Sequence, residues 1–165
     1  MSQKDRRLGG QKIDGHFVKP GEIVLVHDGT LLISVVSVGV VVCIWENGGP
    51  MAAMAHFVEP RTDDVRRATG RFGNVSIPKL LQMVSESTPS GKIEAQIFGG
   101  AIPPRGFGMG EQNIAMARKI LSTRNIPIVS EDIGGTKGRK LMFDTKTGHV
   151  ATIRVHQLRD GDWNL

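Results

Sequence analysis

One apolar run, residues 31–45, constrains the fold of this chain more than any other feature. More than half of its side chains are Val or Ile, which are stiff in helices and pack well on a pleated sheet. A membrane-spanning helix needs about 18–20 apolar residues, and Ser34, Ser37 and Gly39 break this shorter run. The run therefore predicts buried β-strands and not a membrane span.

The segments on either side of this run predict strands that alternate with two helices. Strands are expected at residues 22–27, 51–58, 92–98 and 126–130, with a hairpin over 139–155. Apolar positions three and four apart predict helices around 75–84, capped by Ser76, and over 112–124. The turn at 47–50 brings residues 39–43 within reach of residues 54–57. We expect a single-domain layered α/β fold with a mixed β-sheet and two main helices.

The charge of the chain is partly concentrated at its start. The 165 residues hold 21 basic and 16 acidic side chains, and four of the basic ones lie within residues 1–12 beside one acid. We interpret residues 1–15 as a basic flexible tail and residues 16–165 as one domain. The tail either grips an acidic partner or is a solvated terminus. No aromatic residue interleaves its charges, so a nucleic-acid partner is not expected.

The single cysteine, Cys43, leaves two interpretations open. His56 is expected on the facing strand, where an imidazole could activate the thiol as a nucleophile. Alternatively, Cys43 is a small buried hydrophobe within its β-branched run. A lone cysteine excludes an internal disulfide and favours the reducing cytoplasm. The histidines lack the spacing of metal ligands, and the glycine clusters lack a nucleotide-binding fingerprint, so neither a metal nor another cofactor is expected.

Several short motifs, taken in order, resemble those of one family over residues 20–155. They are Val40-Val-Val-Cys43-Ile, Gly49-Pro-Met-Ala-Ala-Met-Ala-His56-Phe-Val-Glu-Pro60, Ala95-Gln-Ile-Phe-Gly-Gly-Ala101, Gly110-Glu-Gln-Asn113 and Glu131-Asp-Ile-Gly-Gly135. This set is similar to the CheD-type chemoreceptor glutamine deamidases of bacterial chemotaxis. The resemblance implies a cytoplasmic protein that converts receptor glutamines to glutamates. It also implies two partners, the chemoreceptor cytoplasmic region and a CheC-like phosphatase.

The resemblance also implies a catalytic set of Cys nucleophile, His base and supporting Thr, and this chain departs from it. His56 falls on the catalytic His, the nucleophile position falls on Gly39, and the Thr position falls on Ile33. Cys43 matches a second, non-catalytic Cys of the family pattern. Loss of the nucleophile from a triad enzyme costs on the order of 10⁶-fold in rate.

We therefore expect a CheD-like chemotaxis protein that is catalytically silent and acts by binding other proteins. The alternative is an active protein-glutamine deamidase that uses His56 with Cys43, with Ser37 or with an activated water molecule. A third possibility is an unrelated ligand in the old pocket, which Gly39 would enlarge.

Overall fold

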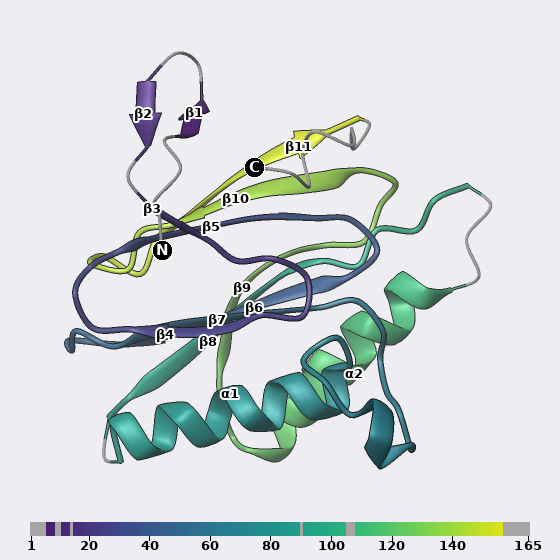
Figure 1. The fold of residues 1–165 in the computed structure, drawn as a ribbon, viewed down its shortest axis with the longest axis horizontal. Helices are drawn as coiled ribbons and strands as arrows, with labels where there is room; N and C mark the ends of the chain where they lie inside the picture. The colour runs from purple at the N-terminus through teal and green to yellow at the C-terminus, as the bar shows by residue number, and fades with distance from the viewer. Residues whose placement is uncertain (1–5, 9–10, 14, 90, 105–107, 157–165) are drawn as a thin grey trace.

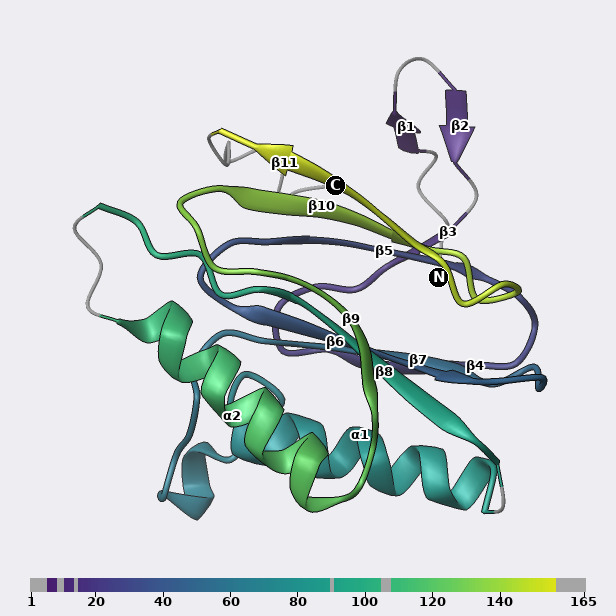
Figure 2. The same ribbon diagram turned by 180° about the vertical axis from the view of Figure 1, so that it is seen from behind.

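The molecule is built in three layers, two β-sheets and one layer of helices. The computed structural model describes residues 6–8, 11–13, 15–89, 91–104 and 108–156. A four-stranded sheet lies on one face of a five-stranded sheet, and two helices cover the other face of the five-stranded sheet (Figure 1). The view from behind shows the same order of layers (Figure 2).

The two sheets are mixed, as the sequence predicts. The four-stranded sheet has the order β11-β10-β5-β3, with β3 Gly15–Phe17, β5 Leu31–Val36, β10 Gly138–Phe143 and β11 Val150–Val155. The five-stranded sheet has the order β4-β7-β6-β8-β9, with β4 Ile23–Val26, β6 Val40–Glu46, β7 Ala52–Phe57, β8 Ile93–Gly99 and β9 Ile128–Ile133. Only the β3–β5 and β8–β9 pairs of these sheets are parallel. The predicted α/β class, with a mixed sheet and two main helices, is confirmed.

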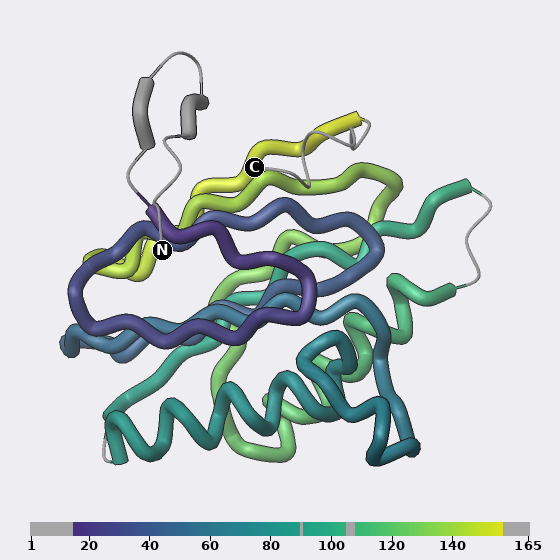
Figure 3. The backbone as a smooth tube through the Cα atoms, in the orientation of Figure 1, coloured from purple at the N-terminus to yellow at the C-terminus, as the bar shows by residue number. Residues whose placement is uncertain are grey.

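The apolar run divides between the two sheets. Its first part forms β5 and its second part forms β6, with a bend at residues 37–39 between them. The chain also passes from one sheet to the other between β3 and β4, between β4 and β5, and between β9 and β10 (Figure 3). Alternate side chains of β6 point to opposite faces of its sheet, so the strand contributes to two apolar cores.

One core lies under the helices and the other lies between the sheets. The first includes Val40, Val42, Ile44, Ala53, Ala55, Phe57, Ile77, Leu80 and Leu121. The second includes Val41, Cys43, Met54, Leu32, Val36, Leu141 and Phe143. Strands β6 and β7 are buried on both faces because each contributes to both cores.

Helix α1, Gly73–Ser87, begins earlier than its sequence predicts. The N-cap is Phe72, so Ser76 and Pro78 lie inside the helix and Ser76 does not cap it. The amides of Gly73 and Asn74 donate instead to the carbonyl oxygens of Glu59 and Pro60, at 2.8 and 3.0 Å. Backbone acceptors from an earlier segment therefore replace the expected side-chain cap.

The remaining elements are short except for the second helix. Helix α2, Met109–Thr123, covers the five-stranded sheet beside α1, and a 3₁₀ turn, η1, spans Val65–Arg67. Near the N-terminus, β1 Arg6–Leu8 pairs antiparallel with β2 Gln11–Ile13. The flexibility of residues 1–15 and their separation from the domain stay predictions. No helix in the described ranges is long and apolar enough to cross a membrane.

Candidate active site

The candidate site is built around His56, which projects from β7 into the space between the two sheets. Its ring is almost fully buried and its Nδ1 lies 3.1 Å from the Oγ of Ser34 on β5. The Ser34 hydroxyl is also buried and donates to the carbonyl oxygen of Val18 at 2.7 Å. The imidazole is therefore held between the sheets by a hydroxyl that is itself held by the backbone.

This hydrogen-bond chain fixes the protonation of the ring. A serine hydroxyl has one proton, and the proton of Ser34 is directed to Val18 O. Ser34 can then only accept from His56, so Nδ1 carries the ring proton and Nε2 presents a lone pair. Burial lowers the pKa of His56 to about 4, an effect that a backbone hydrogen bond to Val18 opposes and the charge of Arg71 reinforces. At neutral pH the ring is an uncharged base.

The lone pair of His56 faces Gly39. A Cβ atom built on Gly39 would lie 3.3 Å from Nε2 of His56. The same atom would lie 2.5 Å from the carbonyl oxygen of Phe57, closer than real Cβ atoms come to other atoms. The strand register also places Gly39 next to this part of β7, since Val40 pairs with Phe57 and Val41 pairs with His56. The structure therefore brings Gly39 and His56 together, and the position beside the base has no side chain.

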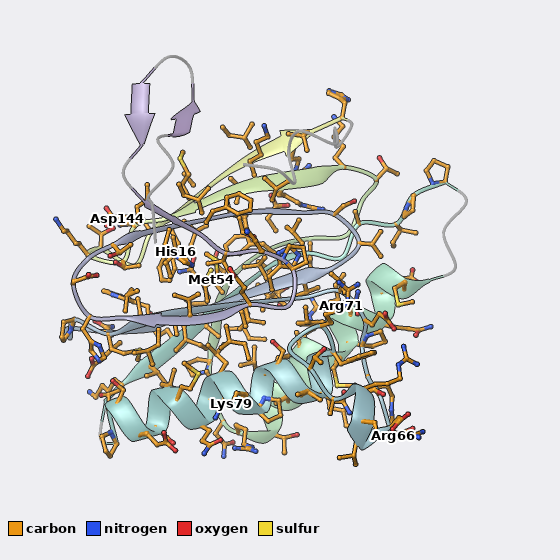
Figure 4. All side chains as sticks on the ribbon, viewed as in Figure 1. His16, Met54, Arg66, Arg71, Lys79 and Asp144 are labelled. Atoms are coloured by element: carbon orange, nitrogen blue, oxygen red, sulfur yellow. The ribbon has the colours of Figure 1, made fainter. Side chains whose placement is uncertain are left out.

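Cys43 lies away from this position, within the core between the sheets. Its direct cross-strand partner is Met54, which is labelled between the sheets in Figure 4. The thiol is 1% exposed and burial alone raises its pKa far above the usual value. No hydrogen bond joins Cys43 to His56 in the part of the chain that the structure describes. A neutral buried thiol of this kind is a packing group and a poor nucleophile.

Ile33 and Ser34 occupy opposite faces of β5. The side chain of Ile33 packs with Phe17 and Val35 on the face that points away from His56. Neighbouring residues of a strand point to opposite faces, so a hydroxyl at position 33 would point away from the imidazole. A hydroxyl that contacts the imidazole is nevertheless present, on the neighbouring Ser34. Sequence reasoning missed Ser34 as a partner of His56, and the strand alternation of residues 31–36 was the signal that could have found it.

Asn113 is a second site residue to which sequence reasoning gave no role. It lies in α2, is fully buried, and its Nδ2 donates to the carbonyl oxygens of Val38 and Val58 at 2.9 and 3.0 Å. These two carbonyls flank Gly39 and Phe57 along the chain. A backbone bond from Gly100 N to Gly39 O, at 2.7 Å, holds the same bend from the other side. Asn113 and the segment after β8 thus fix the backbone beside His56.

Comparison with known proteins assigns the chain to a family. A sequence model of CheD chemotactic sensory transduction proteins matches residues 58–154, which is more than half of the chain. The chain belongs to the CheD family. The family membership that the motifs predicted is thereby confirmed.

Two relatives illustrate the degree of similarity within the CheD family. A protein of Sulfurimonas denitrificans named "Probable chemoreceptor glutamine deamidase CheD" is 34% identical over 117 residues, which cover 67% of this chain and 75% of the relative. A protein of Trichlorobacter lovleyi with the same name is 30% identical over 162 residues, which cover 95% of this chain and 98% of the relative. Among the described residues of this CheD homologue, no three His, Cys, Asp or Glu side chains gather as a metal site.

Proposed function

We propose that this CheD homologue is catalytically silent and acts in cytoplasmic chemotaxis signalling by binding proteins. The observation that carries the proposal is the empty position at Gly39, where a Cβ would lie 3.3 Å from the Nε2 lone pair of His56. A covalent amide hydrolysis needs a nucleophile at this point. Glycine offers none.

The steps of thiol-dependent amide hydrolysis show which catalytic group this site lacks and which it contains. In amide hydrolysis through a thiol, the base takes the thiol proton, the sulfur attacks the amide carbon, and the protonated nitrogen leaves as ammonia. Water then releases the acid. His56, oriented by Ser34, has the geometry of the base in such a sequence. Without a thiol at position 39 no thioester forms there, and His56 has no thiol proton to remove at that position.

The partners proposed are the chemoreceptor cytoplasmic region and a CheC-like phosphatase. Support for the receptor comes from relatives that are named chemoreceptor glutamine deamidases. The phosphatase rests on the resemblance of the sequence to the family. Asn113 and Gly100 hold the backbone of the site in place by hydrogen bonds. A protein without the nucleophile can therefore keep the shape of its surface, and shape is what binding requires.

Binding and chemistry can be measured in one mixture. The protein is incubated with a cytoplasmic fragment of its cognate chemoreceptor, and the fragment is weighed by intact-mass spectrometry while complex formation is followed by pull-down. We expect a complex and no gain of the mass that separates a glutamate from a glutamine. The CheD protein of Sulfurimonas denitrificans with its own receptor fragment serves as the active control. Absence of binding to both receptor and phosphatase would overturn the proposal.

The second candidate is an active deamidase, and the retained pair of Ser34 and His56 favours it. The attacking group would be Cys43, Ser37 or a water molecule that His56 activates. A gain of mass in the receptor fragment would support this candidate. Its loss in Cys43→Ala would assign the thiol, and its loss only in His56→Ala would leave Ser37 or water as the attacking group.

A further inference from the structure

A small cavity with basic walls lies where the chain passes from β9 to β10. Its volume is about 220 Å³, and its walls are Ile133, Gly134, Gly135, Thr136, Lys137, Arg139 and Arg154. We call it the basic pocket. Three of its side chains carry positive charge and none of its lining side chains is acidic. A pocket of this composition selects negatively charged groups.

Arg139 is the group at the wall of the basic pocket whose bonding is incomplete. Its side chain is 2% exposed, Nη1 donates to Lys137 O at 2.8 Å, and Nη2 donates to Asp132 at 3.1 Å. Its buried Nε has no hydrogen-bond partner among the described residues. That nitrogen is covered from solvent, so the Arg139 guanidinium acts on the pocket through its positive charge.

The nearby carboxylate does not cancel the charge of the pocket. Asp132 accepts from Arg139, from Arg154 at 3.0 Å and from Thr152 at 3.3 Å. One carboxylate is thus shared by two guanidinium groups. Within the part of the chain that the structure describes, no carboxylate lies within ion-pair distance of Lys137. The pocket therefore keeps a net positive charge.

The turn that borders the pocket leaves its mouth open. Gly134 and Gly135 have φ values of +72° and +65°, a backbone conformation that favours glycine. A Cβ atom on either residue would meet nothing within 4 Å. These glycines are therefore required by the turn and not by close packing, and they place no side chain over the pocket.

The basic pocket and the candidate active site share one backbone segment. Gly134 N donates to Gly99 O at 2.9 Å, and Ile102 N donates to Gly135 O at 2.7 Å. The neighbouring Gly100 N donates to Gly39 O. Residues 99–102 therefore connect the wall of the basic pocket to the bend at residues 37–39.

We propose that the basic pocket binds an oxyanion, and that in a complex with a partner protein this oxyanion is the carboxylate of an acidic side chain of that partner. The second part rests on the proposed function and the first part does not. Lys137, Arg139 and Arg154 supply the charge that attracts the oxyanion.

The oxyanion site is tested on the full chain by ¹⁵N nuclear magnetic resonance. A short peptide of glutamates, the matching peptide of glutamines and inorganic phosphate are titrated separately. We expect saturable shifts of the Arg139 Nε–H signal and of the amides of Gly134, Gly135 and Thr136 with the glutamate peptide, and none with the glutamine peptide. Shifts with phosphate alone would overturn the assignment to an acidic side chain. Unmoved signals in all three titrations would overturn the site.

A variant separates this pocket from general electrostatic attraction. Lys137→Gln should weaken binding of the glutamate peptide at least about tenfold, because it removes one charged donor from the pocket. Lys79→Gln makes the same charge change on the exposed face of α1 and should leave binding unchanged. Equal weakening by the two variants would overturn the proposal.

The receptor fragment then tests the link to the partner. If the fragment binds and Lys137→Gln weakens that binding, the pocket takes part in docking. If the fragment binds both forms equally, the docking role of the pocket is wrong while the proposed function stands. If the fragment does not bind and the glutamate peptide does, the receptor interaction fails and the oxyanion site stands.

Discussion

His56 shows how burial alone can set the chemistry of one residue. Its ring is 1% exposed, and removal from water penalises the charged form more than the neutral one. The pKa falls to about 4, below the ordinary value of 6.5, mainly by burial. The ring therefore stays neutral near pH 7, whether or not a nucleophile lies beside it.

The stability of the protein should depend on the protonation of His56. In the unfolded chain the imidazole takes up a proton below its ordinary pKa, whereas the folded protein resists this until about pH 4. The unfolded state then binds more protons, so stability falls as pH decreases from about 6.5 to 4, by roughly 3 kcal/mol in total. Urea unfolding between pH 7.5 and 4 measures this loss.

Two variants isolate the contribution of His56 to this pH dependence. His56→Gln removes the titrating group and should flatten the stability profile over that range, even if the variant is less stable throughout. His149→Gln removes an exposed imidazole and should leave the slope as it is. An unchanged slope in His56→Gln would contradict the prediction.

At this scale the sequence located the site but not all of its contacts. The alignment placed Gly39 beside His56, and the structure brings these residues together. It placed the family's Thr position at Ile33 and gave no role to Ser34, whose hydroxyl contacts the imidazole. An ungapped alignment counts positions and carries no information on which face of a strand a side chain occupies.

At the scale of elements, α2 holds together two strand ends through one side chain. Asn113 Nδ2 bridges the carbonyl oxygens of Val38, which follows β5, and Val58, which follows β7. These strands belong to different sheets. The helix therefore sets the distance between the backbone at Gly39 and the backbone at Phe57, and through it the space beside His56.

Replacement of Asn113 should loosen this junction. Asn113→Ala leaves two buried carbonyls without their donor, which should lower the free energy of unfolding by about 1–3 kcal/mol. Asn113→Asp should cost more, because a carboxylate would face two carbonyl oxygens. Urea unfolding and amide exchange at Gly39 and Gly100 measure the effect. Gln112→Ala, at the exposed neighbouring position, is the control, and equal midpoints for the two alanine variants would contradict the role given to Asn113.

The elements themselves were largely predictable and their ends were not. Apolar periodicity located both helices and every strand of the two sheets after residue 20, because burial repeats with the geometry of each element. The start of α1 was missed because its amides are satisfied by Glu59 O and Pro60 O, which lie more than ten residues earlier. Local sequence does not show an acceptor that only the tertiary fold delivers.

At the scale of the whole molecule, one charged group ties the two sheets together. Asp132 lies in β9 of the five-stranded sheet, and its donors Arg139, Arg154 and Thr152 lie in β10 and β11 of the four-stranded sheet. Burial raises the pKa of Asp132, but the hydrogen bonds from Arg154 and Arg139 outweigh it and hold the pKa below its usual range. The carboxylate is thus ionised in the folded protein at neutral pH.

Loss of this carboxylate should lower the free energy of unfolding, because it removes the ionic contact between the two sheets. Asp132→Asn leaves the buried Arg139 without its counter-charge, which should lower stability by about 3–5 kcal/mol. The contribution of Asp132 is present above its ordinary pKa and is lost as pH falls through its lower folded pKa. Chemical denaturation measures the difference. Asp63→Asn removes an exposed carboxylate paired with Arg61 and should change stability by less than about 1 kcal/mol. A similarly small effect at Asp132 would contradict its role as a tie.

The arrangement of the layers is the part of the fold that the sequence left open. Alternation of strands and helices indicated one α/β domain, but it does not tell which strands pair. Leu31–Val36 and Val40–Glu46 read as neighbours in one apolar run, yet they belong to different sheets. Both strands are buried on their two faces, so hydrophobicity alone could not assign them to separate layers.

The close approach of Gly39 to Phe57 bears on how this lineage can evolve. A codon for glycine is a single base change from one for cysteine, so one mutation could place a thiol at position 39. The backbone stands in the way, since a Cβ at position 39 would meet the Phe57 carbonyl oxygen at 2.5 Å. A thiol at position 39 would therefore need a second change that moves this carbonyl. The packing beside His56 therefore opposes any side chain at position 39, whatever its chemistry.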